Sequence, residues 1–283
     1  MKIGILAGFS AATPPDLIAD FGREAEQRGI HSLWVPEHVV FFREYASRYP
    51  YSVDGRIPGE PDGVLEPLTA LTYLAAHTER IRLGTGICLV PQRSPVYTAS
   101  QVANVDYLSG GRVDFGVGVG WCSEEFEALG ISFERRGART RECLAVMKTL
   151  WCDEVSSFSG EFYTLPECLQ NPKPVQKPHP PVFFGGESKA ALRRVADIGQ
   201  GWFGFNLGPE DLPQHLKLLD EELARAGRSR SDVQIYVSPY TRPLDRGVVN
   251  AYRDQGVEQL IVPMFARSRD QLAERLDALM TRI

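Results

Sequence analysis

The stretch Ile81-Arg-Leu-Gly-Thr-Gly-Ile-Cys-Leu-Val-Pro-Gln-Arg-Ser-Pro95 decides the fold of this chain. Its apolar residues predict a buried strand, and Gly84 and Gly86 interrupt that strand near its end. Glycine inside a strand typically marks a bulge or the close approach of a ligand to the backbone. Pro91 and Pro95 then stop the strand and favour the start of a helix. A plain strand-to-helix turn explains the same pattern, so the rest of the chain has to decide between these interpretations.

Short apolar runs alternate with helical segments from one end of the chain to the other. Seven further strands are predicted, at residues 3–7, 32–35, 112–121, 182–184, 201–205, 233–237 and 259–262. Helices are expected between and after them, at residues 13–27, 67–78, 95–108, 134–151, 188–198, 209–226, 243–255 and 268–283. Eight strand–helix units without a break in composition predict one α/β domain over residues 1–283, a (β/α)8 barrel. A doubly wound open sheet is the alternative.

Two segments depart from this alternation. Residues 41–66 form a long polar loop, and a loop of that length in a compact domain is usually functional. Residues 156–181 contain six prolines and predict an insertion before the fifth strand, with a hairpin around Ser159 and Gly160. The active site of a barrel lies at the carboxyl ends of its strands. We therefore expect these two segments to shape the substrate pocket, although they do not identify the substrate.

Composition excludes several classes of function. The 283 residues are 43% hydrophobic and 24% charged, which is typical of a globular protein with a large core. A net charge of −5 offers no basic surface for nucleic acid. No apolar run is long enough to span a membrane. The five cysteines form no CxxC pair and are odd in number, which favours reduced thiols and a cytoplasmic protein.

The catalytic groups that the sequence offers are few. It contains no HxxxH or HExxH metal motif, no GxSxG nucleophile elbow, and no lysine at a predicted strand end. His38 is the only histidine at the carboxyl end of a predicted strand, where it could transfer a proton or serve a structural purpose. With no metal site predicted, the chemistry is expected to belong to an organic cofactor.

Two glycine-rich stretches are candidates for binding that cofactor. Gly185-Gly-Glu-Ser188 lies between a strand and a helix, where free backbone N–H groups bind phosphate well. A glycine turn with Ser188 as the helix cap is the alternative. Glycines at positions 116, 118 and 120 do not match the dinucleotide-binding spacing, but they could leave room for a flat ligand. Trp121, directly after them, is placed either to stack on such a ligand or to pack in the core.

A series of motifs occurs in one order along the chain. They are Val35-Pro-Glu-His38, Leu83-Gly-Thr-Gly-Ile-Cys-Leu-Val-Pro-Gln-Arg93, Leu108-Ser-Gly-Gly-Arg112, Gly116-Val-Gly-Val-Gly-Trp121 with Glu124-Glu-Phe126, Arg136-Gly137 and Pro181-Val-Phe-Phe-Gly-Gly186. Over nearly its whole length the chain thus resembles the bacterial luciferase-like flavin and deazaflavin oxidoreductases. The similarity is greatest to their coenzyme F420-dependent subgroup.

Each motif takes a role from this resemblance. The resemblance implies a (β/α)8 barrel with an insertion before the fifth strand, a homodimer, and a cis peptide bond between Gly86 and Ile87. It implies that His38, with Glu37 beside it, acts as an acid, a base or an anchor for the substrate. The Gly86 backbone would touch the cofactor ring, so a side chain there should cost cofactor affinity more than fold stability. Cofactor contacts to the ring, its chain and the phosphate are implied for Thr85, Gly86, Ile87, Cys88, Leu89, Gly118, Gly120, Trp121, Gly185, Gly186, Glu187 and Ser188.

The expected function is transfer of a hydride between coenzyme F420 and a small organic substrate. The nearest alternative is a two-component monooxygenase that uses FMN, O2 and a separate reductase. The chain departs from the family at two positions. Glu37 stands where aspartate is common, and Trp121 stands where some deazaflavin dehydrogenases carry a glutamate acid, so the mechanism of those enzymes does not transfer directly. A metal-dependent isomerase or lyase using Glu37, His38 and Glu187, or a non-catalytic flavin-binding protein, would belong to other classes.

Overall fold

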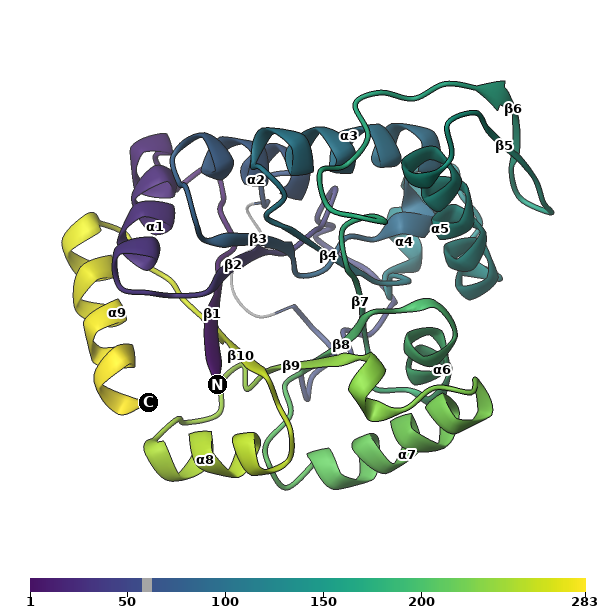
Figure 1. Ribbon diagram of the computed structural model, residues 1–283. Helices are drawn as coiled ribbons and strands as arrows, with labels where there is room; N and C mark the ends of the chain where they lie inside the picture. Colours follow the sequence, from purple (N-terminus) through teal and green to yellow (C-terminus); the bar gives the residue numbers. More distant parts are fainter. Residues whose placement is uncertain (58–62) are drawn as a thin grey trace.

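Eight parallel strands close into a barrel in the computed structural model, which describes residues 1–57 and 63–283 (Figure 1). Each barrel strand pairs with the next barrel strand along the chain, so that β4 pairs with β7, and β10 pairs with β1 to close the ring. The predicted (β/α)8 barrel is confirmed, and the open doubly wound sheet is wrong. The barrel strands are β1 Lys2–Leu6, β2 Ser32–Val35, β3 Arg82–Thr85, β4 Val113–Val117, β7 Val182–Gly185, β8 Gly201–Phe205, β9 Gln234–Ser238 and β10 Gln259–Pro263.

A helix follows every barrel strand and covers the outside of the barrel (Figure 1). Several of these helices begin one to three residues later than predicted, because capping residues precede the first helical turn. The main helices are α1 Pro15–Gln27, α2 Pro67–Ala76, α3 Pro95–Leu108, α5 Arg136–Cys152, α6 Lys189–Ile198, α7 Leu212–Arg225, α8 Arg246–Asp254 and α9 Arg269–Arg282. Shorter pieces are α4 Ser123–Ala128 and the 3₁₀ turns Val90–Gln92 and Arg230–Asp232.

The insertion before the fifth barrel strand is a hairpin on the outside of the molecule. Strands β5 Ser156–Ser159 and β6 Thr164–Cys168 pair antiparallel and form their own small sheet (Figure 1). The predicted hairpin is therefore confirmed.

The inside of the barrel is filled by aromatic side chains around Trp34. The Trp34 ring lies 5.2 Å from that of Phe203 and 5.8 Å from that of Phe183 (centroid to centroid). A Cβ atom at Gly84 would lie only 2.3 Å from the Trp34 ring, so this glycine makes room for the tryptophan. One of the two glycines that interrupt the third strand thus has a packing role in the core and faces no ligand.

Arg112 explains the Leu-Ser-Gly-Gly-Arg motif at the amino end of the barrel. Its buried guanidinium group donates hydrogen bonds to the backbone carbonyls of Ala75 (3.1 Å), Thr78 (3.0 Å), Ile81 (2.9 Å) and Ser109 (2.7 Å). These carbonyls lie at the end of α2, before β3, and at the end of α3. One side chain therefore joins three consecutive segments of the fold.

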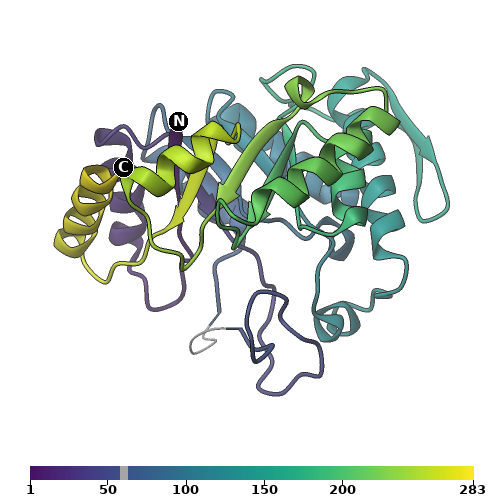
Figure 2. The same ribbon diagram turned by 90° about the horizontal axis from the view of Figure 1, so that it is seen from below.

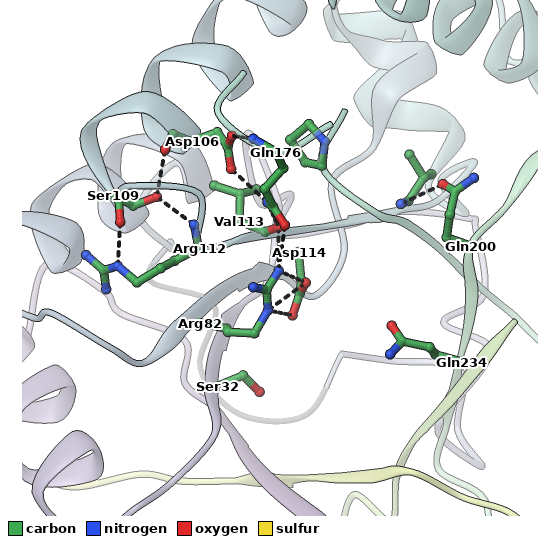
Figure 3. Close-up of polar contacts among 12 residues, drawn as sticks. Ser32, Arg82, Asp106, Ser109, Arg112, Val113, Asp114, Gln176, Gln200 and Gln234 are labelled. Atoms are coloured by element: carbon green, nitrogen blue, oxygen red, sulfur yellow. Dashed lines mark hydrogen bonds and ion pairs between the residues drawn. The ribbon is translucent and has the colours of Figure 1, made fainter. Parts of the chain in front are cut away.

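Further polar contacts at this end connect the insertion to the barrel (Figure 3). The Arg82 guanidinium pairs with the buried Asp114 carboxylate, with Nε 3.0 Å from both oxygens. Gln176, from the insertion, donates from its backbone N–H to Asp106 (3.0 Å) and from its amide to the Val113 carbonyl (2.7 Å). Polar contacts at the amino end of a barrel usually serve stability, which leaves the opposite end for function.

Replacing Arg112 with methionine is expected to lower the free energy of unfolding by about 3 kcal/mol, because several buried carbonyls lose their donor. Urea unfolding followed by circular dichroism measures this change. Arg80→Met is the matched control, since Arg80 is 70% exposed and its ion pairs are on the surface. That control should cost about 1 kcal/mol or less. Equal losses in the two variants would contradict the joining role of Arg112.

Candidate active site at the carboxyl end of the barrel

A bulge follows β3 at the carboxyl end of the barrel. The peptide bond between Gly86 and Ile87 is cis, as the resemblance implies. The Cys88 N–H donates to the Gly116 carbonyl (2.8 Å), and the Gly118 N–H donates to the Cys88 carbonyl (2.8 Å). The bulge is therefore hydrogen-bonded directly to β4, and the half-buried Ile87 side chain packs on top of the aromatic core.

Two of the predicted ligand-binding glycines pack against Ile87. A Cβ atom at Gly118 would lie 2.3 Å from Ile87 Cδ1, and one at Gly185 would lie 2.5 Å from the same atom. This corrects the expectation that the glycine at position 118 leaves space for a flat ligand, because the Ile87 side chain takes that space. The exposed side of Ile87 is then the surface that a flat ring could contact.

Several residues predicted to back the cofactor ring have buried side chains. Thr85 and Cys88 are fully buried, and the Thr85 hydroxyl donates to the Gly116 carbonyl (2.6 Å). Leu89 is 5% exposed. A Cβ atom at Gly86 would meet the side chains of core residues, the nearest being Leu6 Cδ1 at 3.0 Å. A side chain at position 86 would thus press on core side chains as well as change the bulge, and its effect on cofactor affinity stays a prediction.

Glu37 lies behind the bulge and does not face the barrel mouth. Its buried carboxylate accepts hydrogen bonds from the Leu89 N–H and from Arg93, whose Nε lies 2.7 Å away. Arg93 also pairs with Glu66 at 2.6 Å. The structure thus places Glu37 where it fixes the end of the bulge, and we assign it a positioning role.

His38 points its Nδ1 atom at a buried carboxylate that sequence reasoning missed. Nδ1 lies 3.1 Å from Oε1 of Glu125, which is 1% exposed and also accepts the Val39 N–H (3.1 Å). When Glu125 is ionised, Nδ1 carries a proton and Nε2 is left to exchange one with a ligand. Glu125 is the second of two adjacent glutamates at the start of α4. The sequence does not show which of the two is buried, so the partner of His38 could not be predicted.

Aromatic side chains surround His38 and form one wall of the site. The Trp121 ring lies 5.9 Å from His38, 5.7 Å from Tyr45 and 5.4 Å from Tyr49. The tyrosines come from the 41–66 loop, and Figure 2 shows this segment projecting beyond the carboxyl ends of the strands. Residues 58–62 of that loop lie outside the described part of the chain. A small cavity here is lined by His38, Val40, Phe41, Phe42, Tyr45, Ile57, Trp121 and Cys122.

One carboxylate attaches this loop to the end of β4. Glu124 accepts hydrogen bonds from the backbone N–H groups of Ala46 (2.6 Å) and Ser47 (3.1 Å). Although partial burial opposes the effect, hydrogen bonds from Ser47 and from these backbone groups lower the pKa of Glu124 to about 2. The loop is therefore attached to an ionised Glu124 at ordinary pH.

A second carboxylate attaches the loop to the end of β7. Glu187 accepts from the Tyr51 hydroxyl (3.1 Å) and from the Phe205 N–H (2.8 Å), and burial raises its pKa. The structure shows this side chain attached to the loop and to β8, and its predicted role at a phosphate stays a prediction. Ser188 accepts the Ala191 N–H (3.2 Å) as the cap of α6, and Gly186 has a positive φ of 103°. The first turn of α6, with its N–H groups, remains available for an anion.

A pair of arginines lies between the ends of β4 and β7. Arg194 on α6 is 7% exposed, and its Nε atom has no hydrogen-bond partner among the described residues. Burial, followed by the charges of Arg141 and Arg136, lowers the pKa of Arg194 to about 10. Arg136 Nε donates to the Gly120 carbonyl at 3.0 Å. This positive charge, which has no acidic partner among the described residues, fits an anionic group. It could not be predicted from the sequence because its members meet only in the fold.

Other types of site are absent from the part of the chain that the structure describes. Residues 1–57 and 63–283 contain no group of three or more His, Cys, Asp or Glu side chains that could hold a metal ion. None of the helices described has the length and apolar character needed to cross a bilayer. All five cysteines are free thiols.

Comparison with known proteins places the chain in a family. Residues 1–245 match the model of the luciferase-like monooxygenase family. The chain belongs to this family. An uncharacterised protein of Mycobacterium tuberculosis (strain H37Rv) is 32% identical over 265 residues, 92% of each chain. The protein is thus a luciferase-like oxidoreductase, a group whose members use F420 or FMN.

Relatives with named cofactors include users of both. An F420-dependent glucose-6-phosphate dehydrogenase of Kineococcus radiotolerans is 29% identical over 242 residues, 82% of this chain and 65% of the relative. An FMNH2-dependent dimethylsulfone monooxygenase of Pseudomonas putida is 31% identical over 182 residues, 63% of this chain and 49% of the relative. The fold is shared with monooxygenase RslO1 of Streptomyces bottropensis, at a TM-score of 0.78 and 21% identity, covering 100% of this chain and 98% of that one.

The loop attachment at Glu187 predicts a pH effect that Glu187→Gln should remove. Because its pKa in the folded state lies above the ordinary 4.5, the wild-type protein gains stability from this group at low pH. That gain is lost as the pH rises from 4.5 through the raised pKa. The variant keeps an acceptor for Tyr51 and does not titrate, so it should become progressively more stable than wild type between pH 4.5 and 7. Urea unfolding across this range is the measurement, with exposed Glu154→Gln as control. Parallel curves for wild type and variant would contradict the effect.

Proposed function

We propose that this luciferase-like protein is an F420-dependent oxidoreductase that transfers a hydride between the deazaflavin and a small organic substrate. The observation that carries the proposal is His38, oriented by the buried Glu125 beside the Ile87 bulge. Hydride transfer to a carbonyl, or from an alcohol, needs a group that gives or takes a proton at the substrate oxygen. A carboxylate-oriented imidazole is well suited to that task near neutral pH.

The residues at the barrel mouth fit the cofactor at two places. The exposed side of Ile87 offers an apolar floor for a flat ring, and Trp121 stands at the edge of the same mouth. The phosphate would be held by the first turn of α6 and by Arg194, whose buried Nε lacks a partner among the described residues. When bound, the deazaflavin would supply or accept the hydride.

The chain's own residues would manage the proton. His38 would exchange a proton with the substrate oxygen through Nε2, and Glu125 would keep the ring oriented and stabilise the imidazolium form. Glu37 would have an indirect role. Its hydrogen bonds with Leu89 and Arg93 would hold the end of the bulge next to His38. The aromatic wall of Trp121 and the loop tyrosines would favour an apolar substrate and limit the access of water.

Parallel titration of the protein with F420 and with FMN, followed by fluorescence, tests the choice of cofactor. The proposal expects tight binding of F420 and much weaker binding of FMN. The phosphate site described above would also accept FMN, and the Pseudomonas putida relative is FMNH2-dependent. Preference for FMN would therefore overturn the proposal in favour of oxygen chemistry with a separate reductase.

His38→Ala is expected to lower kcat by about 10²-fold or more, because a positioned proton-transfer group contributes about 10²–10⁴-fold. The dissociation constant for F420 should stay within about twofold of wild type. Glu125→Gln should lower kcat less, since the amide oxygen can still accept a hydrogen bond from the imidazole. Steady-state kinetics with F420 and an alcohol or enone substrate measure both effects. Unchanged turnover in His38→Ala would remove this residue from the mechanism.

Arg194→Met is expected to weaken F420 binding by about tenfold or more without lowering the stability of the cofactor-free protein. The Arg194 side chain is buried and its Nε has no partner among the described residues, and burial lowers its pKa, so its removal should not destabilise the fold. Arg193→Met is the matched control, because Arg193 lies on the same helix, is 45% exposed and already pairs with Glu222. A loss of stability in Arg194→Met with unchanged F420 affinity would make Arg194 a structural residue.

A further inference from the structure

A second cavity lies at the barrel mouth, between the loops that follow β1 and β10. Its volume is about 500 Å³, within the range of sites for small molecules. It shares none of its lining residues with the aromatic cavity beside His38. Its lining includes Phe9, Phe21, Phe265, Arg267, Gln271 and Arg275. This cavity, which we call the β1–β10 cavity, takes no part in the function proposed above.

Two guanidinium groups of the β1–β10 cavity have no acidic partner in the part of the chain that the structure describes. Within residues 1–57 and 63–283, no carboxylate forms an ion pair with Arg267 or Arg275, although neighbouring arginines are paired. Arg269 pairs with Glu24 at 2.7 Å, for example. The Arg275 guanidinium donates to the Phe265 carbonyl at the rim, which holds it beside the cavity. Uncompensated arginines at a cavity favour a carboxylate or a similar planar anion.

The other walls of the cavity are apolar. Phe9 and Phe21 are buried and meet edge to face, with ring centroids 5.2 Å apart. Met264 is buried beneath them, and Phe265 is 60% exposed. An exposed phenylalanine next to an open cavity is a surface that an apolar ligand could cover. The Gln271 amide oxygen accepts the Arg267 N–H (2.8 Å), which fixes the backbone on the charged side.

We propose that the β1–β10 cavity binds a small organic carboxylate with an apolar body. The carboxylate would lie on Arg267 and Arg275, and the apolar body would lie against Phe9 and Phe265. Neither half of the cavity suffices alone, because the arginines would accept any small anion and the aromatic surface any apolar molecule. The combination defines the ligand class. This site involves neither His38 nor the arginine pair at α6, so it does not depend on the identity of the cofactor.

Calorimetric titration of the cofactor-free protein with three probes tests the proposal. Phenylacetate carries both the charge and the apolar body, 2-phenylethanol lacks the charge, and acetate lacks the apolar body. We expect phenylacetate to bind at least tenfold more tightly than either of the others. In the double variant Arg267→Gln, Arg275→Gln, phenylacetate should bind at least tenfold more weakly. Arg246→Gln, an exposed arginine at the start of α8, is the control and should leave binding unchanged.

A second variant keeps the test valid should the double variant fold poorly. Phe265→Ser removes an exposed side chain and should weaken phenylacetate binding while leaving acetate binding unchanged. Equal binding of phenylacetate and 2-phenylethanol, or no effect of the arginine substitutions in a folded variant, would overturn the proposal. Since all titrations are made without F420 or FMN, their failure leaves the proposed oxidoreductase function unaffected, and failure of the cofactor titration leaves this site unaffected.

Discussion

The packing of Ile87 between Gly118 and Gly185 is the constraint on which the site depends. Before Ile87, the Gly86 N–H donates to the Val35 carbonyl (2.6 Å), and after it Cys88 is hydrogen-bonded to Gly116 and Gly118. Any side chain at Gly118 or Gly185 would occupy the space of Ile87. The carboxyl ends of β3, β4 and β7 therefore meet around the Ile87 side chain. The bulge ends at Leu89, whose N–H donates to the Glu37 carboxylate. Hydrogen bonds therefore hold both ends of the bulge.

This constraint also fixes the groups that carry the chemistry. Glu37 is followed directly by His38, so the contact that holds the bulge sets the backbone from which the imidazole projects. Gln92, in the 3₁₀ turn after the bulge, approaches the carboxylate of Glu125 (3.5 Å), which in turn holds the imidazole. Bulge, carboxylate and histidine thus form one connected unit. A buried polar unit of this kind holds its geometry only if its members stay paired.

The two ends of the barrel treat charge differently. At the amino end, the Arg112 guanidinium has a full set of acceptors and Arg82 is paired with Asp114, as a stabilising network requires. At the carboxyl end, Arg194 has an orphaned Nε and the β1–β10 cavity carries arginines without carboxylate partners in the described chain. A buried charge without a partner costs stability, so the buried Arg194 marks this end as the binding face.

The sequence predicted the barrel because its strands and helices alternate in strict periods, and it predicted the bulge because glycines interrupt a strand. Which side of the bulge each residue faces depends on hydrogen bonds to β4, so the sequence did not reveal that Thr85 and Cys88 are fully buried. Their contacts with the cofactor stay predictions. Glu125 and Arg194 were missed because burial on a helix face and unpaired charge appear only after distant segments pack. The homodimer implied by the resemblance stays a prediction.

The most direct test of this account is methyl NMR of the protein labelled at isoleucine δ1 positions and titrated with F420. The account places a flat ring on the exposed side of Ile87. It therefore predicts that the Ile87 methyl signal shifts more than any other isoleucine signal and shows cross-relaxation to the ring protons. A saturating F420 titration in which the Ile87 signal stays unchanged would contradict the central claim that this bulge is the floor of the active site.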